Sequence, residues 1–215
     1  MNKTNQMMPL FMTIVGCILV AYKIFPLFLN MADQDKSDLL LMLLAFISVY
    51  VSWMIYELRI TKNEIKKSSE NFDNHTMEVA AIIKISLLIS LFCGQPHTSW
   101  PQVIIGIFTA ISGILIRCLA IHKIGNLYSH RIRVPEKLII AGAYKFIRHP
   151  AYLGTAIAHT GFVIAFLNFY SLILLAAWYF VIWLRVTTEE RVSQQTQIYQ
   201  DYSAKVKYKL LPFIW

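Results

Sequence analysis

Apolar stretches long enough to cross a bilayer recur along most of this chain. A transmembrane helix needs about 20 mostly apolar residues, with a range of about 17–25. The sequence offers six candidate stretches, at 7–29, 39–56, 79–94, 101–122, 151–167 and 170–184. Within lipid, a segment must satisfy its backbone hydrogen bonds internally, so such stretches favour helices. We therefore predict an all-α polytopic membrane bundle of about six transmembrane spans. Five spans are possible, because the third stretch is short.

Composition supports a membrane class and argues against a soluble nucleic-acid-binding protein. Hydrophobic residues make up 57% of the 215 residues and charged residues 15%, whereas soluble domains average about 45–50% and about 25%. The net charge of +8 would suggest nucleic acid in a soluble protein. Here the basic residues flank apolar stretches, so membrane lipid headgroups explain them better. We predict no nucleic-acid partner, and the sequence leaves the oligomeric state open.

Lysine and arginine gather in every second connection between the predicted spans. They concentrate at 59–67, at 123–148 and at 185–209, whereas the connection at 30–38 is mainly acidic. Basic residues of membrane proteins lie preferentially on the cytoplasmic side. This alternation predicts that both termini and the polar segments 123–149 and 185–209 face the cytoplasm.

Several common catalytic and cofactor motifs are absent from the sequence. No two of the eight glycines are separated by a single residue, which excludes a G-x-G-x-x-G dinucleotide fingerprint, and no Walker-type phosphate loop occurs. None of the six histidines forms H-E-x-x-H or lies at zinc-ligand spacing from a cysteine. We therefore predict no metal site, and any cofactor would have to be held in another way.

Two polar clusters flank the last predicted hairpin, at 138–154 and 185–190. Pro150 suits the first turn of a helix, which would place Arg148 and His149 at a helix N-terminus. Free N–H groups and the positive dipole end favour an anion there, such as a carboxylate. Arg185 and Glu189 are four residues apart and share a helix face. Because a short turn joins the two spans, both clusters should be neighbours and could grip one zwitterionic cofactor.

The spacing of these residues resembles a known family. The run Gly-x-Tyr-x-x-x-Arg-His-Pro-x-Tyr-x-Gly at 142–154, followed by Arg-Val-x-x-Glu-Glu at 185–190, is similar to the isoprenylcysteine carboxyl methyltransferase family, membrane enzymes related to phospholipid methyltransferases. The lead-in Arg117-x-x-Ala120 with Ile124-Gly125 matches as well. The resemblance covers about 113–215. We accordingly divide the chain into N-terminal transmembrane helices, 1–100, and a methyltransferase core, 101–215.

The resemblance implies S-adenosyl-L-methionine (SAM) in a cytoplasm-facing pocket formed by the last two spans and the tail. On this reading, and with Arg148 added from the helix-terminus argument, six residues hold the cofactor: Tyr144, Arg148, His149, Tyr152, Gly154 and Glu190. Arg185 and Glu189 would be the catalytic residues on the acceptor side. The tail, with Tyr199, Tyr202 and 212–214, would close the pocket. One departure is that 191–198 lacks the Phe-Gly that the family carries there.

Several functions remain open at this point. The first expectation is carboxyl O-methylation of an isoprenylcysteine-like acceptor, and the alternative is methylation of a phospholipid amine or another lipophilic molecule. Arg185 could fix a carboxylate acceptor, whereas an amine acceptor would need a base, for which Glu189 is the candidate. A carrier is disfavoured because the ionisable residues cluster at the membrane rim rather than at mid-membrane. An inactive scaffold is a further alternative.

The remaining polar and aromatic residues of the apolar stretches have structural interpretations. We expect Arg117 and Lys84 to snorkel toward an interface. His159 has two interpretations: it faces the pocket, or it is a packed or hydrogen-bonded histidine. The tryptophans are read as interface anchors; they are Trp53, Trp100, Trp178, Trp183 and Trp215. The first two spans carry no motif and are assigned a structural role.

Overall fold

The computed structural model describes residues 34–65, 76–92, 99–135, 137–212 and 215, together with isolated positions 18, 22 and 25. The span predicted at 7–29 therefore lies outside the continuous described ranges. Within those ranges all regular secondary structure is helical, and the β-type pairing is one isolated bridge between Ile147 and Tyr208. The predicted all-α class is confirmed for this part of the chain.

Each predicted apolar stretch within the described ranges forms a helix. The helices are α2 (Gln34–Ile65), α3 (Thr76–Phe92), α4 (Trp100–Ile124), α5 (Pro150–Ala165), α6 (Phe169–Ser193) and α7 (Gln197–Lys205), with short 3-10 turns η1 (Gly125–Leu127) and η2 (Gly142–Lys145). Three of them are long and apolar enough to cross a membrane, over Ser37–Ile60, Trp100–Leu127 and Phe169–Ser193. The helices α3 and α5 are shorter, with 17 and 16 residues.

Local sequence signals explain where the last helices begin. Pro150 occupies the first turn of α5, as predicted, and His149 is its N-cap; proline suits that position because its missing N–H would have no helical partner. The next helix, α6, starts with a capping box, in which Ser171 N–H donates to Asn168 Oδ1 at 2.9 Å and Asn168 N–H donates to Ser171 Oγ at 3.1 Å. The short turn between these helices therefore holds α5 and α6 as an antiparallel hairpin.

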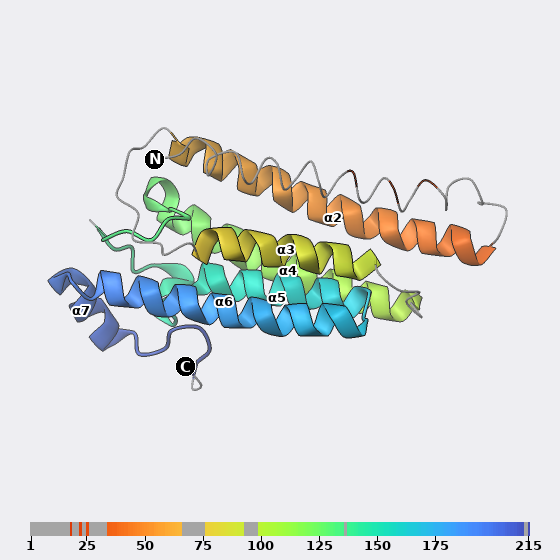
Figure 1. Cartoon of the computed structure of the whole chain (residues 1–215). Coiled ribbons are helices and arrows are strands. Elements are labelled where there is room, and N and C mark those ends of the chain that lie inside the picture. The colour runs from red at the N-terminus through yellow and green to blue at the C-terminus, as the bar shows by residue number, and fades with distance from the viewer. Residues whose placement is uncertain are drawn as a thin grey trace.

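The long helices lie side by side and alternate in direction (Figure 1). The C-terminal ends of α2, α4 and α6 and the N-terminal ends of α3 and α5 consequently meet at one end of the bundle. The segment 125–149 and helix α7 lie at this same end. Which side of a membrane this end faces remains the prediction drawn from the charge pattern.

Small residues bring α4 and α5 into close contact, and this is the most extensive helix pair in the described part of the chain. A Cβ on Gly113 would lie 2.3 Å from Ala158 N, and one on Gly161 would lie 2.3 Å from Ala110 N. Gly106 likewise faces the backbone of Ala165. Glycines allow two helix backbones to approach in this way, so the pair would have to separate if a larger residue replaced them.

Aromatic side chains fill the centre of the bundle. Phe46 on α2 contacts Phe162 and Phe166 edge to face, with ring centroids 4.9 and 5.1 Å apart. Trp53 and Trp178 are only 2% and 3% exposed, so the prediction that they are interface anchors is wrong. They belong to the core because they point between helices rather than toward the ends of the spans.

Candidate functional site

Glu190, near the end of α6, contacts polar side chains at the start of α5 and on α7. Its Oε1 accepts hydrogen bonds from Tyr199 OH at 2.6 Å and from His149 Nε2 at 2.7 Å. Arg148 Nε forms an ion pair with the same oxygen at 3.2 Å. Glu190, His149 and Tyr199 are buried. We call these four residues, Arg148, His149, Glu190 and Tyr199, the Glu190 cluster.

The backbone at the start of α5 is engaged by the C-terminal tail. Arg148 N–H donates to Tyr208 O and His149 N–H donates to Lys209 O, both at 2.9 Å. The expectation that free N–H groups here receive an anion is therefore wrong for these two donors, because tail carbonyls already accept from them. Any contribution of Arg148 and His149 to a ligand must come from their side chains.

Helix α7 covers the same end of the bundle. Tyr202 OH donates to the carbonyl of Tyr144 at 2.8 Å, and both tyrosines are buried. Burial raises the pKa of Tyr202 to about 12, and burial followed by the neighbouring Glu190 carboxylate raises that of Tyr199. Both phenols are therefore neutral donors at ordinary pH. Although 191–198 lacks Phe-Gly, the tail still brings Tyr199 to Glu190.

Arg185, one turn before Glu189 on α6, is held by three different segments. Its Nη2 donates to His130 O at 2.6 Å, its Nη1 to Thr76 Oγ1 at 3.0 Å and its Nε to Tyr152 OH at 3.3 Å. The residue is 6% exposed. The positive charge thus occupies a defined place at the junction of α3, α5, α6 and the segment after α4.

The two motif segments predicted to be neighbours do meet. His149 contacts Glu190, and Tyr152 contacts Arg185, at the distances given above. Glu189 lies on the same side, with its Oε1 3.9 Å from His149 Nδ1 and its side chain 35% exposed. The hairpin therefore brings residues 148–152 and 185–190 to one place, as expected from the short turn.

Gly154 sits one turn further into α5 and faces α4. A Cβ at this position would lie 2.5 Å from Arg117 N and 2.6 Å from Gly113 O. Helix packing thus accounts for the glycine at this position without any ligand. Its assignment as a cofactor contact remains a prediction.

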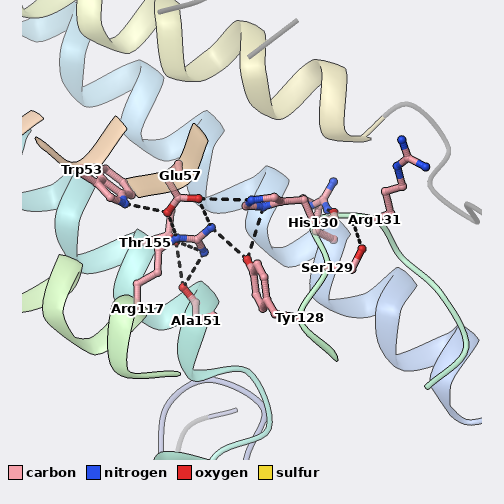
Figure 2. Close-up of polar contacts among 10 residues, drawn as sticks. Trp53, Glu57, Arg117, Tyr128, Ser129, His130, Arg131, Ala151 and Thr155 are labelled. Carbon is pink, nitrogen blue, oxygen red and sulfur yellow. Dashed lines mark hydrogen bonds and ion pairs between the residues drawn. The ribbon is translucent and has the colours of Figure 1, made fainter. Parts of the chain in front are cut away.

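A second polar cluster lies beside the first, and the sequence did not predict it. Arg117 on α4 donates from Nε to Glu57 Oε1 at 2.5 Å and from Nη2 to Glu57 Oε2 at 2.8 Å (Figure 2). Arg117 is 5% exposed, so the prediction that it snorkels to an interface is wrong. It is retained inside the bundle because a carboxylate from α2 pairs with both sides of its guanidinium group.

Further side chains complete the surroundings of this ion pair. Arg117 also donates to Thr155 Oγ1 at 2.9 Å and to Tyr128 OH at 3.1 Å, and Trp53 Nε1 donates to Glu57 Oε1 at 2.8 Å. His130 Nε2 lies 3.5 Å from Glu57 Oε2. We call these residues the Glu57 cluster: Trp53, Glu57, Arg117, Tyr128, His130 and Thr155.

Two signals in the sequence could have located the Glu57 cluster. An ionisable residue inside an apolar span normally has a partner, and Arg117 is such a residue. Glu57 directly follows the second apolar stretch, at 39–56, and lies four residues after Trp53, so the two share a helix face. Pairing the two charges would still have required knowing that α2 packs against α4.

His159 and Lys84 lie deeper in the bundle and have aromatic partners. His159 Nδ1 donates to Thr155 O at 2.8 Å, and its ring lies 4.7 Å from that of Trp178. Of the two interpretations of His159, that of a packed, hydrogen-bonded histidine is confirmed. Lys84 Nζ lies 5.0 Å from the Trp178 ring, a cation–π contact between helices.

Comparison with known proteins identifies relatives of the central part of the chain. The model of the isoprenylcysteine carboxyl methyltransferase family matches residues 104–195. A probable protein-S-isoprenylcysteine O-methyltransferase from Oryza sativa subsp. indica is 33% identical over 125 residues, which is 54% of this chain and 63% of that protein. The same values hold for the corresponding protein of Oryza sativa subsp. japonica.

A protein-S-isoprenylcysteine O-methyltransferase from Saccharomyces cerevisiae is 30% identical over 121 residues, which is 52% of this chain and 49% of the yeast protein. The chain thus spans about half to two thirds of the length of these relatives. The match includes Arg117, both motif segments and the hairpin that joins them, and the structure brings these residues to one end of the bundle. Over residues 104–195, the chain is similar to the isoprenylcysteine carboxyl methyltransferase family.

Proposed function

We propose that this protein is an integral membrane methyltransferase that uses SAM and acts on a lipophilic acceptor. Carboxyl O-methylation of an isoprenylcysteine-like substrate is the reaction that we favour. The observation that carries the proposal is the meeting of residues 148–152 with 185–190 at one end of the α5–α6 hairpin. These residues lie in the segment that matches the family, and the relatives bear the name of this reaction.

The residues at this place fit the charges of SAM. The cofactor carries a carboxylate, an ammonium group and a sulfonium, and the site offers Arg148 with two carboxylates, Glu189 and Glu190. The buried Nε of Arg148 has no hydrogen-bond partner among the described residues, although Glu190 lies within ion-pair distance. A polar ligand would satisfy this N–H group, since a buried donor without an acceptor is costly.

Within this proposal, each predicted cofactor residue has a defined place. Arg148 and His149 would bind anionic or polar groups, and Glu190 would receive the cation. Tyr144 and Tyr152 would border the ligand, and Gly154 would bring α5 close to α4 behind them. SAM supplies an activated methyl group. The enzyme then mainly aligns the acceptor and keeps water away from the reacting groups. Helix α7, with Tyr199 and Tyr202, would exclude the water.

Arg185 is the proposed binding residue for the acceptor. A carboxylate acceptor is ionised near pH 7 and needs no general base, so the main requirement is a cation in a fixed position. The three hydrogen bonds of Arg185 provide that position. Guanidinium groups bind carboxylates with defined geometry. Glu189, the more exposed carboxylate, would orient the acceptor or, for an amine, accept its proton.

The membrane setting would bring the acceptor to this site. Three described helices are long and apolar enough to span a bilayer, and the polar clusters lie at the end where these helices stop. A lipophilic acceptor would enter from the bilayer, and SAM would enter from the aqueous side. The charge pattern makes that side the cytoplasm, with both termini on it.

SAM binding by the purified protein in detergent, measured by calorimetry, is the first test. Labelled methyl transfer to a farnesylcysteine analogue and to phosphatidylethanolamine then separates the two acceptor classes. Transfer to the first supports carboxyl methylation, and transfer to the second alone supports the amine alternative. Binding of SAM without transfer to either would point to a different acceptor or a scaffold, and absence of SAM binding would refute the proposal.

Variants assign the roles of the acceptor-side residues. We expect Arg185→Ala and Glu189→Ala to abolish methyl transfer while the protein still folds and binds SAM. Arg191→Ala is the matched control, because Arg191 is an exposed arginine on the same helix. Full activity in both Arg185→Ala and Glu189→Ala would remove these assignments.

A further inference from the structure

We propose that Glu57 of α2 is a positioning residue for the acceptor side of the site. It lies outside the segment that matches the family, and it acts on Arg185 through the segment 128–130. The inference rests on the proposed function, because Arg185 is the residue that would bind the acceptor. It gives the N-terminal part of the chain, which carries no motif, a role in the reaction.

The first step is the attachment of Glu57 itself. Its two carboxylate oxygens accept from Arg117 Nε and Nη2, and Oε1 also accepts from Trp53 Nε1. Glu57 is 9% exposed. Charge-assisted, bidentate hydrogen bonds of this kind are strong and directional. Glu57 therefore has a defined position between α2 and α4.

The second step leads from this ion pair to the segment after α4. Tyr128 OH accepts from Arg117 Nη2 at 3.1 Å, and His130 Nε2 lies 3.5 Å from Glu57 Oε2 (Figure 2). The Tyr128 and His130 rings contact each other edge to face, with centroids 5.2 Å apart. Two side chains of one short segment thus contact the same ion pair, and these contacts hold residues 128–130 against the bundle.

The imidazole of His130 is neutral under ordinary conditions. Burial lowers the pKa of His130 to about 3, although the nearby Glu57 carboxylate acts in the opposite direction. Its contact with Glu57 is therefore a polar contact of a neutral ring rather than an ion pair. A variant that removes the Glu57 charge would leave this ring next to an unpaired Arg117 and disturb the segment.

The third step connects this segment to Arg185. The backbone carbonyl of His130 accepts from Arg185 Nη2 at 2.6 Å, the shortest of the described hydrogen bonds of that guanidinium group. A shift of the segment 128–130 consequently moves or releases one side of the guanidinium. Thr76 and Tyr152 hold the other side, so we expect misplacement of Arg185 rather than its loss from the site.

The Glu190 cluster, on the cofactor side, is connected differently, although Tyr152 joins the two sides through its hydrogen bond with Arg185 Nε. The described partners of Glu190 are Arg148, His149 and Tyr199, and the start of α5 is tied to the tail at 208–209. None of these contacts passes through the segment 128–130. A change at Glu57 should therefore separate binding of the acceptor from binding of SAM.

The test uses the full-length chain with Glu57→Gln, which keeps the shape of the side chain and removes its charge. We expect the KM for a farnesylcysteine analogue to rise at least about tenfold, the magnitude typical of a lost charged hydrogen bond, and the SAM Kd to change less than about twofold. Hydrogen–deuterium exchange of 128–133 should become faster, without a change in α5 and α6. Asp201→Asn, an exposed carboxylate on α7, is the matched control and should behave as the wild type.

Trp53→Phe serves as a second variant if Glu57→Gln does not fold. It removes one hydrogen bond to Glu57 and leaves the ion pair with Arg117, so the same changes should appear with smaller size. Equal losses of SAM affinity and acceptor affinity would show a general structural role and overturn the inference. Unchanged exchange at 128–133 would overturn it as well, whether or not the wild type transfers methyl groups. If the wild type fails to bind SAM, the proposed function is refuted separately.

Discussion

The Glu190 cluster and the Glu57 cluster lie at the same end of the bundle but are built in different ways. The Glu190 cluster joins residues of two neighbouring helices and the tail that follows them. The Glu57 cluster joins α2 to α4 and to the segment 128–130, and Arg117 and Glu57 are 60 residues apart in the chain. The first cluster shares one carboxylate oxygen among three donors, whereas the second uses both oxygens of its carboxylate in an ion pair.

This difference suggests a division of tasks. In the Glu57 cluster, both charged groups are buried and paired with each other, so this cluster mainly holds α2 against α4. In the Glu190 cluster, a buried Arg148 N–H group has no hydrogen-bond partner among the described residues, and Glu189 beside it is partly exposed. We expect substitutions in the Glu57 cluster to act on stability and on the place of Arg185, and substitutions in the Glu190 cluster to act on the ligand.

The largest effect is expected from Arg117→Ala. It leaves Glu57 buried without its cation, and breaking a buried ion pair in this way costs about 3–5 kcal/mol of unfolding free energy. Thermal unfolding in detergent measures the loss. The double variant Glu57→Ala with Arg117→Ala should be less destabilised than the sum of the two single variants. Additive losses would show that the two residues are not an energetically coupled pair.

Glu190→Gln should separate ligand binding from stability. Loss of a charged hydrogen-bond acceptor costs about 1.5–3 kcal/mol, so we expect SAM to bind about 10- to 100-fold more weakly. Calorimetry gives the affinity, and the melting temperature without ligand should change less than in Arg117→Ala. Unaltered SAM affinity would remove Glu190 from the proposed cofactor site. It would also contradict the proposed difference between a ligand-binding Glu190 cluster and a structural Glu57 cluster.

Gly154→Ala tests whether this glycine serves packing or the cofactor. The added methyl group would meet the backbone of α4 at 2.5–2.6 Å, and overpacking of this kind costs about 1–3 kcal/mol. Thermal unfolding should show the loss with or without SAM. A stable protein with impaired SAM binding would favour the cofactor role over the packing role.

The smallest effect concerns the pH dependence of stability through His130. Its folded-state pKa is lowered to about 3 by burial, so between roughly pH 6.5 and that value the unfolded chain binds more protons than the folded one. Stability contributed by the neutral ring is thus present above pH 6.5 and is lost as the pH falls. The groups that face the ring include Glu57, Arg117 and Tyr128.

His130→Asn should therefore show a shallower decline in melting temperature than the wild type between pH 7 and pH 5.5. We expect the loss of unfolding free energy over this range to differ by about 1 kcal/mol. Identical slopes would mean that His130 titrates as an exposed histidine, and the anchoring of the segment 128–130 would then need another explanation.

Features that depend on neighbouring residues were predicted well. The position of Pro150 at the start of α5, the turn at Asn168 and the meeting of 148–152 with 185–190 follow from local signals and a short connection, and the structure confirms them. The N–H groups of Arg148 and His149 were expected to be free for an anion, but both donate to carbonyls of the tail at 208–209. That pairing depends on a segment about 60 residues further along the chain, and no pattern around residues 148–149 predicts it.

Features that depend on helix packing could not be predicted in the same way. Arg117 and Trp53 were expected at an interface, and both are buried. A single helix reveals which residues share a face but not which helix covers that face. The close approach of α4 and α5 likewise depends on glycines of two helices that match only when the helices are side by side.

By itself, the sequence determined the helical class of the described part, the α5–α6 hairpin and the motif by which residues 104–195 resemble the isoprenylcysteine carboxyl methyltransferase family, because apolar length, capping residues and short connections act within a few turns of chain. The tertiary structure alone decided that Glu57 pairs with Arg117, that His130 holds Arg185 and that the tail occupies the start of α5. These contacts form between segments far apart in the chain. Their partners are selected by the packing of whole helices, which no single stretch of sequence encodes.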